Sequence, residues 1–299
     1  MGIDVHQHIW TAGFVEALRR RATPPFLSGW TLHLDGEAPY EVNPRDHDLR
    51  HRLGFNRDHG IDLALVSLSS PLGVEHLPPG DAWPLLDAYH EGALSLPPSF
   101  RAWASACVSA VDPARTAEAL DRGFAGLQLP ATALLDAEGL ARVAPLLDLL
   151  HDRDLPLFVH PGPAGAAEGP AWWPALVPYV QQMHAAWYAF RTFGRPRHPR
   201  LRVCFALLAG LAPLHVERLI ARGGSARGSV DPDAYLETSS YGHQAIDAIT
   251  RVVGVEVVVL GSDAPYAEPA RTLLGEAIEQ QISLTNPTRL LSLEGAVHR

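Results

Sequence analysis

Two histidines near the N-terminus have the spacing of a metal-binding pair. His6 and His8 flank Gln7 directly after the short apolar run Ile3–Val5. On an extended strand this spacing turns both imidazoles to the same side, while Val5 and Gln7 point to the other. Imidazole is a common ligand of zinc and related ions. The pair could therefore supply two ligands to a single ion.

Two more potential ligands follow later apolar runs. His160 ends the run Leu155–His160, and Asp263 comes just after the run Val255–Gly261. A single histidine in such a place is more often a hydrogen-bonded, partly buried residue. Three imidazoles and a carboxylate at three separate strand ends would be an unusual accident. Together they suit one divalent ion, with zinc as the first choice and manganese or iron as alternatives.

The elements that must position these residues alternate along the chain. Short apolar runs rich in β-branched residues predict eight strands, at Ile3–Val5, Ile61–Leu68, Ala102–Val108, Gly126–Leu129, Leu155–His160, Leu201–Leu207, Tyr235–Ser239 and Val255–Gly261. Helical patterns fall between them, around Phe14–Arg21, Asp46–His59, Trp83–Leu94, Ala114–Arg122, Leu140–Arg153, Pro213–Ala221, His243–Val253 and Pro269–Gln281.

Eight such repeats favour an α/β fold of the (β/α)8 type, the TIM barrel. The strands are apolar enough to be covered on both faces, as in a parallel sheet. A doubly wound open sheet is the alternative, but it would place a glycine-rich phosphate loop after the first strand. The chain has His6-Gln7-His8-Ile9-Trp10 there. In a barrel the carboxyl ends of the strands form the functional face, where the four candidate ligands would meet.

Two segments exceed a minimal barrel, and both are predicted at its mouth. Pro24–Val42, after the first strand, carries two short apolar runs around Asp35-Gly36 and predicts a hairpin. Gly162–Arg200, after the fifth strand, predicts a helical insertion with a helix near Leu176–Phe193. No linker divides the sequence, so residues 1–299 are expected to form one domain.

The composition favours a small molecule as partner. Hydrophobic residues make up 47% of the chain and charged residues 19%, and the net charge is −9. Without a basic run, a nucleic acid or a membrane surface is not expected as a partner. The N-terminus lacks a signal-peptide pattern, which predicts a cytoplasmic protein. Cys107 and Cys204 lie in apolar runs and are expected to be free thiols. All 24 basic side chains are arginine, so no lysine can form a Schiff base or a carboxylated metal bridge.

The motifs resemble those of the amidohydrolase superfamily. They are Asp4-Val5-His6-Gln7-His8, Phe158-Val159-His160-Pro161 and Gly261-Ser262-Asp263-Ala264-Pro265. The nearest branch is the amidohydrolase-related (amidohydrolase 2) group, which includes aminocarboxymuconate-semialdehyde decarboxylase and 2-pyrone-4,6-dicarboxylate lactonase. The resemblance covers nearly the whole chain. It implies that His6, His8, His160 and Asp263 bind the metal, that the reaction is hydrolysis or nonoxidative decarboxylation, and that a homodimer is plausible.

The sequence departs from the family pattern at the sixth strand. Members commonly place a histidine there that acts as acid, base or substrate contact, and Leu207 stands in its place. His215 could replace it only if the following loop folds inward; a surface or helix-capping role is the alternative. In the fourth strand Gln128 is a poor bridging anion, which favours a single metal ion.

Several hypotheses for the function follow. The first is a metal-dependent hydrolase of a small ester, lactone or amide, with Asp263 as general base for a metal-activated water. The alternatives are a metal-dependent decarboxylase and a barrel that binds ligand without turnover, the last because of Leu207. The candidate substrate contacts are Trp10, Trp172, Trp173, His184, Ser239 and Tyr241. The tryptophans could instead pack the insertion against the barrel, and His184 could pack on a neighbouring helix.

Overall fold

Eight parallel strands form the centre of the fold in a computed structural model, which describes residues 2–165, 169–225 and 230–293. They are β1 (Ile3–Gln7), β5 (Leu63–Val66), β6 with β7 (Phe100–Ala102 and Ala104–Ser105), β8 (Leu127–Pro130), β9 (Leu157–His160), β10 (Val203–Phe205), β11 (Ala234–Glu237) and β12 (Val258–Val259). Strands β6 and β7, separated by Trp103, overlap the first part of the predicted strand Ala102–Val108 and begin two residues before it. Each strand pairs with its neighbour in chain order, and every pairing is parallel.

Backbone hydrogen bonds close these strands into a ring. The Val5 N–H donates to the Leu260 carbonyl at 2.9 Å, and the Asp263 N–H donates to the His6 carbonyl at 2.9 Å. Gln7 forms a parallel bridge with Ala264. The first strand is thus joined to the segment that follows the last one, as the (β/α)8 barrel requires.

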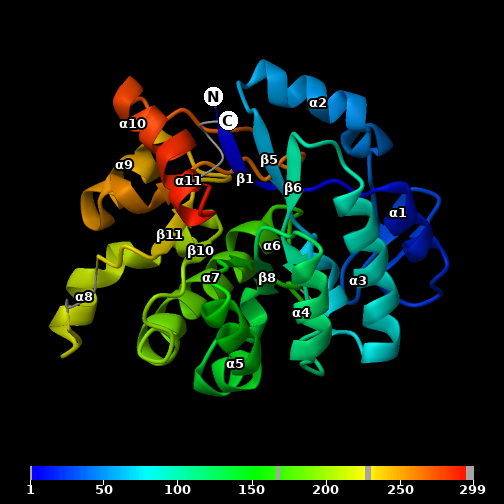
Figure 1. The fold of residues 1–299 in the computed structure, drawn as a ribbon, viewed down its shortest axis with the longest axis horizontal. Coiled ribbons are helices and arrows are strands. Elements are labelled where there is room, and N and C mark those ends of the chain that lie inside the picture. The colour runs from blue at the N-terminus through cyan, green and yellow to red at the C-terminus, as the bar shows by residue number, and fades with distance from the viewer. Residues whose placement is uncertain (1, 166–168, 226–229, 294–299) are drawn as a thin grey trace.

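Helices surround the barrel (Figure 1). They are α1 (Ala12–Arg19), α2 (Leu49–Asp58), α3 (Pro79–Leu94), α4 (Pro113–Asp121), α5 (Ala137–Asp152), α6 (Trp173–Leu176), α7 (Pro178–Ala189), α8 (Val216–Ala221), α9 (His243–Val253), α10 (Glu276–Gln280) and α11 (Asn286–Leu290). Aspartate side chains cap α2, α4 and α5 by accepting a hydrogen bond from a first-turn N–H. Such caps satisfy amides that have no partner within the helix.

Aromatic side chains fill the inside of the barrel. Trp103 is fully buried and stacks on Phe158, with ring centroids 5.3 Å apart. Its indole N–H donates to the Val5 carbonyl at 2.9 Å, which satisfies the polar end of a buried ring. The barrel interior is therefore a packed core, and the site must lie at one end of it.

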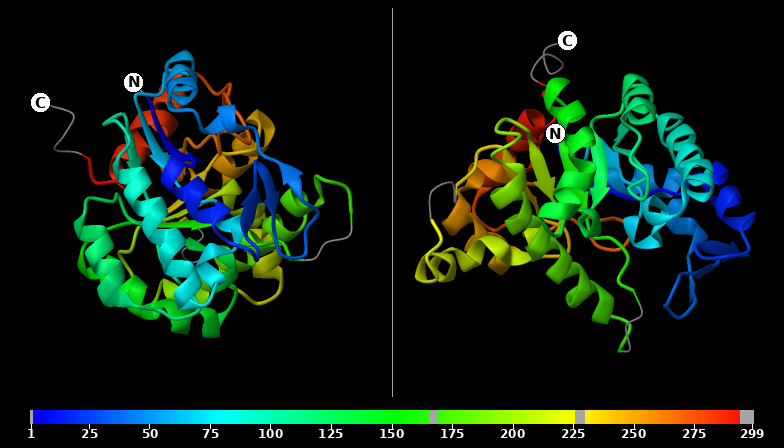
Figure 2. Two further views of the ribbon diagram at one scale, coloured as in Figure 1. Left: turned by 90° about the vertical axis from the view of Figure 1, so that its right-hand side faces the viewer. Right: turned by 90° about the horizontal axis from the view of Figure 1, so that it is seen from below.

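Both insertions project from the same end of the molecule (Figure 2). After β1 the chain forms a three-stranded antiparallel sheet of β2 (Phe26–Ser28), β3 (Thr31–His33) and β4 (Tyr40–Glu41). The predicted hairpin is confirmed as β3 and β4, and β2 is an additional strand. After β9 the chain carries α6, α7 and a π-helical turn at Phe190–Gly194. Residues 166–168 of this insertion lie outside the described residues.

Two predicted helices begin later than expected. The helix expected from Pro269 begins only at Glu276, because Gly275 has a φ of +99° and the carboxylate of Glu279 binds the Thr272 N–H at 2.6 Å. The helix expected from Pro213 begins at Val216, since Pro213–His215 belong to the 3-10 helical segment that continues from the left-handed turn. Both departures depend on contacts or dihedral angles that helical periodicity does not contain.

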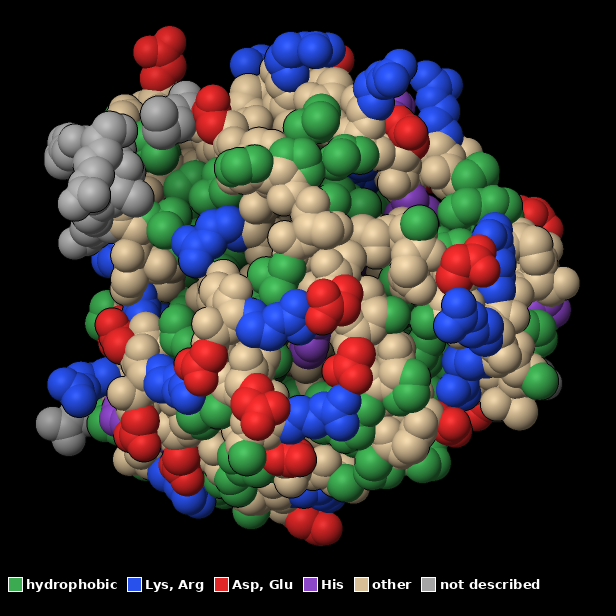
Figure 3. Space-filling model, turned by 45° about the vertical axis from the view of Figure 1, so that its right-hand side comes forward, with side chains coloured by type: hydrophobic (Ala, Val, Ile, Leu, Met, Phe, Trp, Pro, Cys, Tyr) green, Lys and Arg blue, Asp and Glu red, His purple; other side chains and the backbone are tan. Residues whose placement is uncertain are grey.

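The described surface carries charges of both signs. On the face in Figure 3, arginine and acidic side chains are interspersed among neutral ones. None of the described helices is both long and apolar enough to cross a bilayer.

Candidate metal centre

Four ligand atoms converge at the carboxyl ends of β1, β9 and β12. The nitrogen and oxygen atoms of His6, His8, His160 and Asp263 all lie within 4.8 Å of one another. His8 Nε2 is 3.1 Å from both His6 Nε2 and Asp263 Oδ1. Metal–ligand bonds of about 2.0–2.2 Å place neighbouring ligand atoms roughly 3–3.5 Å apart. The separations between these ligand atoms fit a single ion.

The second nitrogen of each histidine has its own acceptor. His8 Nδ1 lies 3.0 Å from the Ser67 carbonyl oxygen and His160 Nδ1 lies 2.8 Å from the Pro161 carbonyl oxygen. A carbonyl oxygen only accepts, so both Nδ1 atoms must donate. His6 Nδ1 lies 3.2 Å from a carboxylate oxygen of Glu237. This pattern is typical of metal-binding histidines, whose other nitrogen is held by an acceptor.

The same bonds explain why the site fits a cation. When each Nδ1 carries the proton of a neutral imidazole, each Nε2 presents a lone pair. Those of His6 and His8 then face each other at 3.1 Å, beside the carboxylate of Asp263. Lone pairs and a carboxylate at this distance repel one another unless a positive charge lies between them. The donor set of three nitrogens and one oxygen suits zinc, manganese or iron.

The surroundings shift the pKa values of the three histidines in different directions. Burial lowers the pKa of His8, and it lowers the pKa of His160 well below the usual value. Burial opposes the charged form of His6 as well, but the carboxylates of Asp263 and Glu237 outweigh it and raise the pKa of His6. His6 is therefore the ligand in the most negative environment.

Glu237 is a further residue in contact with the candidate ligands that the sequence analysis did not identify. It ends β11, is fully buried and accepts from the Leu207 N–H at 3.3 Å and the Ser239 hydroxyl at 2.7 Å, in addition to His6. A Cβ on Gly261 would come within 1.9 Å of a Glu237 oxygen. Two features of the sequence could have indicated Glu237. It is a carboxylate at the end of a strand, and Gly261 leaves space for it just after the next strand.

A buried carboxylate behind the site joins the first and last strands. Asp4 accepts from the Ser262 N–H at 3.0 Å, the Ser262 hydroxyl at 2.6 Å, the Gln7 amide at 2.8 Å and the His6 N–H at 3.0 Å. The pairing of β1 with β5 shifts register between Asp4 and Gln7. This irregularity lets Asp4 bond to Gln7 behind the strand while His6 faces the barrel. Arg52 of α2 donates to the Gln7 side chain at 2.6 Å and to the Ala264 carbonyl at 3.1 Å.

The sixth strand ends in a left-handed turn. Leu207, Leu208, Ala209, Gly210 and Leu211 all have φ between 47° and 60°. For residues other than glycine this conformation costs roughly 1–2 kcal/mol each. The turn packs against α7, where a Cβ on Gly210 would come within 2.5 Å of the Val180 carbonyl oxygen.

His215 follows this turn and is exposed. Its ring centroid lies 5.0 Å from that of His184 on α7. His184 therefore packs against a histidine of the segment that follows β10. Neither ring belongs to the group of four ligands.

The predicted substrate contacts lie in different surroundings. Trp10 is buried, stacks on His47 with centroids 4.7 Å apart and donates its indole N–H to Ser69 at 3.1 Å. The Ser239 hydroxyl is bonded to Glu237. Trp172 is 56% exposed and Trp173 36% exposed, on the insertion. Tyr241 is partly buried after β11. A substrate role thus competes with existing bonds for Trp10 and Ser239, while Trp172 has the exposure that a substrate contact requires.

A third buried carboxyl group lies at the ends of the second to fourth strands. Glu75 is fully buried and accepts from the hydroxyl groups of Ser70 and Ser105. Gln128 donates to Ser70 at 2.7 Å and to the Leu68 carbonyl at 2.8 Å. Gln128 is therefore committed to this network, and the group of four ligands does not include it.

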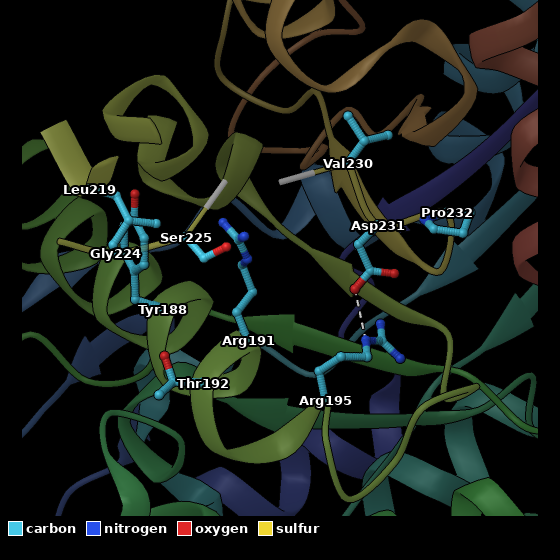
Figure 4. A pocket seen from close by; sticks show the side chains of 10 residues that line it. All are labelled: Tyr188, Arg191, Thr192, Arg195, Leu219, Gly224, Ser225, Val230, Asp231 and Pro232. Carbon is cyan, nitrogen blue, oxygen red and sulfur yellow. Dashed lines mark hydrogen bonds and ion pairs between the residues drawn. The ribbon is translucent and has the colours of Figure 1, made fainter. Parts of the chain in front are cut away.

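A surface cavity of about 590 Å³ lies elsewhere, between the helical segment 188–195 and the segments 219–225 and 230–232 (Figure 4). Arg195 in its wall pairs with Asp231 at 2.7 Å. None of the four candidate ligands lines this cavity, so it does not alter the placement of the site at the barrel mouth.

Solved structures of similar length share the fold. The IDCase of Metarhizium anisopliae in apo form matches with a TM-score of 0.80 at 16% identity, over 98% of this chain and 97% of that chain. A 5-carboxyvanillate decarboxylase of Novosphingobium aromaticivorans, complexed with manganese and 4-hydroxy-3-methoxy-5-nitrobenzoic acid, matches with a TM-score of 0.75 at 17% identity, over 98% and 96%. A 2,6-dihydroxybenzoate decarboxylase from Rhizobium matches with a TM-score of 0.69 at 18% identity, over 98% and 99%.

These matches confirm the (β/α)8 barrel that the alternation of strands and helices predicted. No family model matches the sequence, and no curated relative matches it.

Proposed function

We propose that this protein is a metal-dependent enzyme of the amidohydrolase type that removes a carboxylate from a small carboxylic acid without oxidation. The observation that carries the proposal is the convergence of three histidine nitrogens and the Asp263 carboxylate within 4.8 Å, with the other nitrogen of each histidine bonded to an acceptor. Decarboxylation takes precedence over the hydrolysis first expected, because two of the similar structures are decarboxylases and one of these holds manganese.

His6, His8, His160 and Asp263 would hold one divalent ion. When bound, such an ion acts as a Lewis acid that polarises a carboxylate or hydroxyl oxygen of the substrate. Manganese and zinc both accept this donor set, and a metal assay decides between them.

Asp263 is the residue proposed to move the proton. Its side chain is 17% exposed, the only one of the four ligand side chains that the solvent reaches to that extent. In its protonated form it would deliver a proton to the carbon that carries the carboxylate. The bond between that carbon and the carboxylate then breaks, its electron pair remains with the carbon skeleton, and CO2 leaves. With Leu207 at the sixth strand, Asp263 performs this task without the histidine common in the family.

Two measurements test this proposal. Purified protein should contain close to one equivalent of a divalent transition metal, either as isolated or after reconstitution. Less than a tenth of an equivalent under both conditions would remove the metal centre. Released CO2 is then assayed with aromatic acids such as 5-carboxyvanillate and 2,6-dihydroxybenzoate, which the names of the similar structures suggest as first substrates.

Hydrolysis of a lactone, ester or amide is the second candidate. The same four ligands could activate a water molecule, with Asp263 accepting its proton. A panel of lactones assayed for released acid distinguishes the two reactions. Acid release without CO2 release would favour hydrolysis. Full metal occupancy with neither product would leave the third hypothesis, a barrel that binds ligand without turnover.

A further inference from the structure

Glu237 differs from the other groups that hold the metal-binding histidines. The Nδ1 atoms of His8 and His160 face neutral backbone carbonyls, whereas His6 Nδ1 faces a fully buried carboxylate at 3.2 Å. Hydrogen bonds to a charged acceptor are about twice as strong as those between neutral groups. His6 therefore differs from the other two histidines in the charge of its acceptor, which makes it a better electron donor.

The carboxylate of Glu237 is itself fixed from several sides. It accepts from the Ser239 N–H at 2.5 Å, the Ser239 hydroxyl at 2.7 Å and the Leu207 N–H at 3.3 Å. The absence of a side chain at Gly261 leaves the space that it occupies. Loss of the Glu237 carboxylate would leave the donors on Ser239 and Leu207 without their acceptor. Loss of an apolar core side chain has no such effect.

Charge also distinguishes the site. Neutral imidazoles contribute no net charge, so Asp263 alone would leave a bound dication with one uncompensated positive charge in a buried setting. Glu237 supplies the second negative charge at a distance of one histidine ring. An uncompensated buried charge is costly, and a nearby opposite charge reduces this cost.

We infer that Glu237 is a positioning residue of the metal centre: it fixes His6 as an Nε2 ligand and balances the charge of the bound dication. This inference rests on the proposed metal centre but not on the reaction that the enzyme catalyses. Groups of this kind, when mutated, typically cost 10- to 100-fold in metal affinity.

The chain provides a matched control in Glu75. It is also a fully buried glutamate at a strand-end loop of the barrel, bonded to serine hydroxyls, but it has no contact with the four ligands. Glu237→Gln and Glu75→Gln therefore replace the same side chain at two buried positions, of which only one bonds to a candidate ligand.

The experiment measures Mn²⁺ dissociation constants, from the electron paramagnetic resonance signal of free Mn²⁺, and the visible spectrum at saturating Co²⁺. We expect Glu237→Gln to weaken Mn²⁺ binding by about 10- to 100-fold and to change the Co²⁺ spectrum. Glu75→Gln should leave both unchanged. Unchanged affinity and spectrum in Glu237→Gln, or equal losses in the two variants, would overturn the inference.

Two further outcomes remain distinguishable. If the natural protein binds neither Mn²⁺ nor Co²⁺, the proposed metal centre fails, and with it this inference. If Glu237→Gln does not fold, Ser239→Ala carries the test, because it removes the 2.7 Å bond to Glu237 and no ligand. Weaker Mn²⁺ binding in Ser239→Ala supports the positioning role, and unchanged binding contradicts it.

Discussion

The two halves of the barrel mouth use buried polar groups differently. At the ends of β1 and β9–β12, the side chains of His6, His160 and Asp263 point ligand atoms toward one centre, and Glu237 bonds to His6 from behind. At the ends of β5, β7 and β8, the buried polar groups of Ser70, Ser105 and Gln128 bond to one another and to Glu75. We call the first the metal half, because its candidate ligand atoms converge, and the second the network half, because its polar groups bond to one another. Two oxygen atoms of this network, Glu75 Oε2 and Gln128 Oε1, are buried without a hydrogen-bond partner among the described residues.

Backbone strain follows the same division. In the metal half, Leu207–Leu211, Ser240 and Asp263 have positive φ, and only one residue in this group, Gly210, is a glycine. In the loops after β5, β7 and β8, as far as these loops are described, positive φ occurs at Gly73 alone. Strained residues persist where the surrounding structure holds them, and they gather at functional sites. The backbone angles therefore support the proposed site in the metal half, independently of the ligand types.

The largest expected effect separates chemistry from binding within the metal half. Asp263→Asn keeps an oxygen that can bind a metal but cannot move a proton as a carboxyl group does. We expect turnover to fall by about 10²- to 10⁴-fold with the metal retained. The measurement is turnover of whichever substrate is identified, with metal content determined on the same sample. Full activity in this variant would remove Asp263 as the proton carrier.

A smaller effect tests the connection behind the metal half. Asp4→Ala removes the acceptor of four buried donors, of which the Gln7 amide keeps a second acceptor in Asn56 at 2.9 Å. We expect the free energy of unfolding to fall by about 3 kcal/mol, measured from urea midpoints. Glu16→Ala is the control, since its ion pair with Arg19 is exposed and should contribute less than about 1 kcal/mol. Equal losses in the two variants would show that Asp4 does not join the strands.

Some features of the two halves could be predicted from the sequence, and others could not. The convergence of the four candidate ligands was predictable because each stands at a strand end and because the spacing of His6 and His8 is local. Glu237 was not, since its partner His6 is 231 positions away and a lone glutamate has no spacing pattern. The turn at Leu207–Leu211 was not predictable either, because leucine and alanine disfavour the left-handed region. Helical periodicity located most helices but could not show that Gly275 and Glu279 delay the start of α10.

In the network half, the titration of Glu75 should make the stability of the fold depend on pH. Burial raises the pKa of Glu75 above its usual value. A carboxyl group with a raised pKa in the folded state stabilises the fold below its unfolded pKa, near 4.5, and this contribution is lost as the pH rises through the folded pKa. Glutamine does not titrate. The stability of Glu75→Gln relative to the natural protein should therefore increase as the pH rises from about 4.5 through the folded pKa.

Urea midpoints of both proteins across this pH interval check the prediction. The midpoint difference between Glu75→Gln and the natural protein should move in favour of the variant with rising pH. A difference that stays constant with pH would mean that Glu75 titrates in the folded protein as it does in the unfolded chain. The network half would then need an ionised Glu75, and its resemblance to the metal half would be closer than its bonds indicate.

The smallest expected effect concerns the division of strain. Ser240 is exposed with a φ of +62°, and glycine adopts this conformation without a steric penalty. Ser240→Gly should therefore raise the free energy of unfolding by up to about 1 kcal/mol, less the entropy that glycine adds to the unfolded chain. Gly73→Ala is the counterpart in the network half: its φ is +76° and a Cβ would lie 3.2 Å from the Pro163 side chain, so it should lose about 1 kcal/mol or more. Thermal midpoints of both variants test the pair. If Ser240→Gly gained nothing while Gly73→Ala lost stability, the backbone at Ser240 would be relaxed, and the strain of the metal half would be confined to Asp263 and the turn after β10.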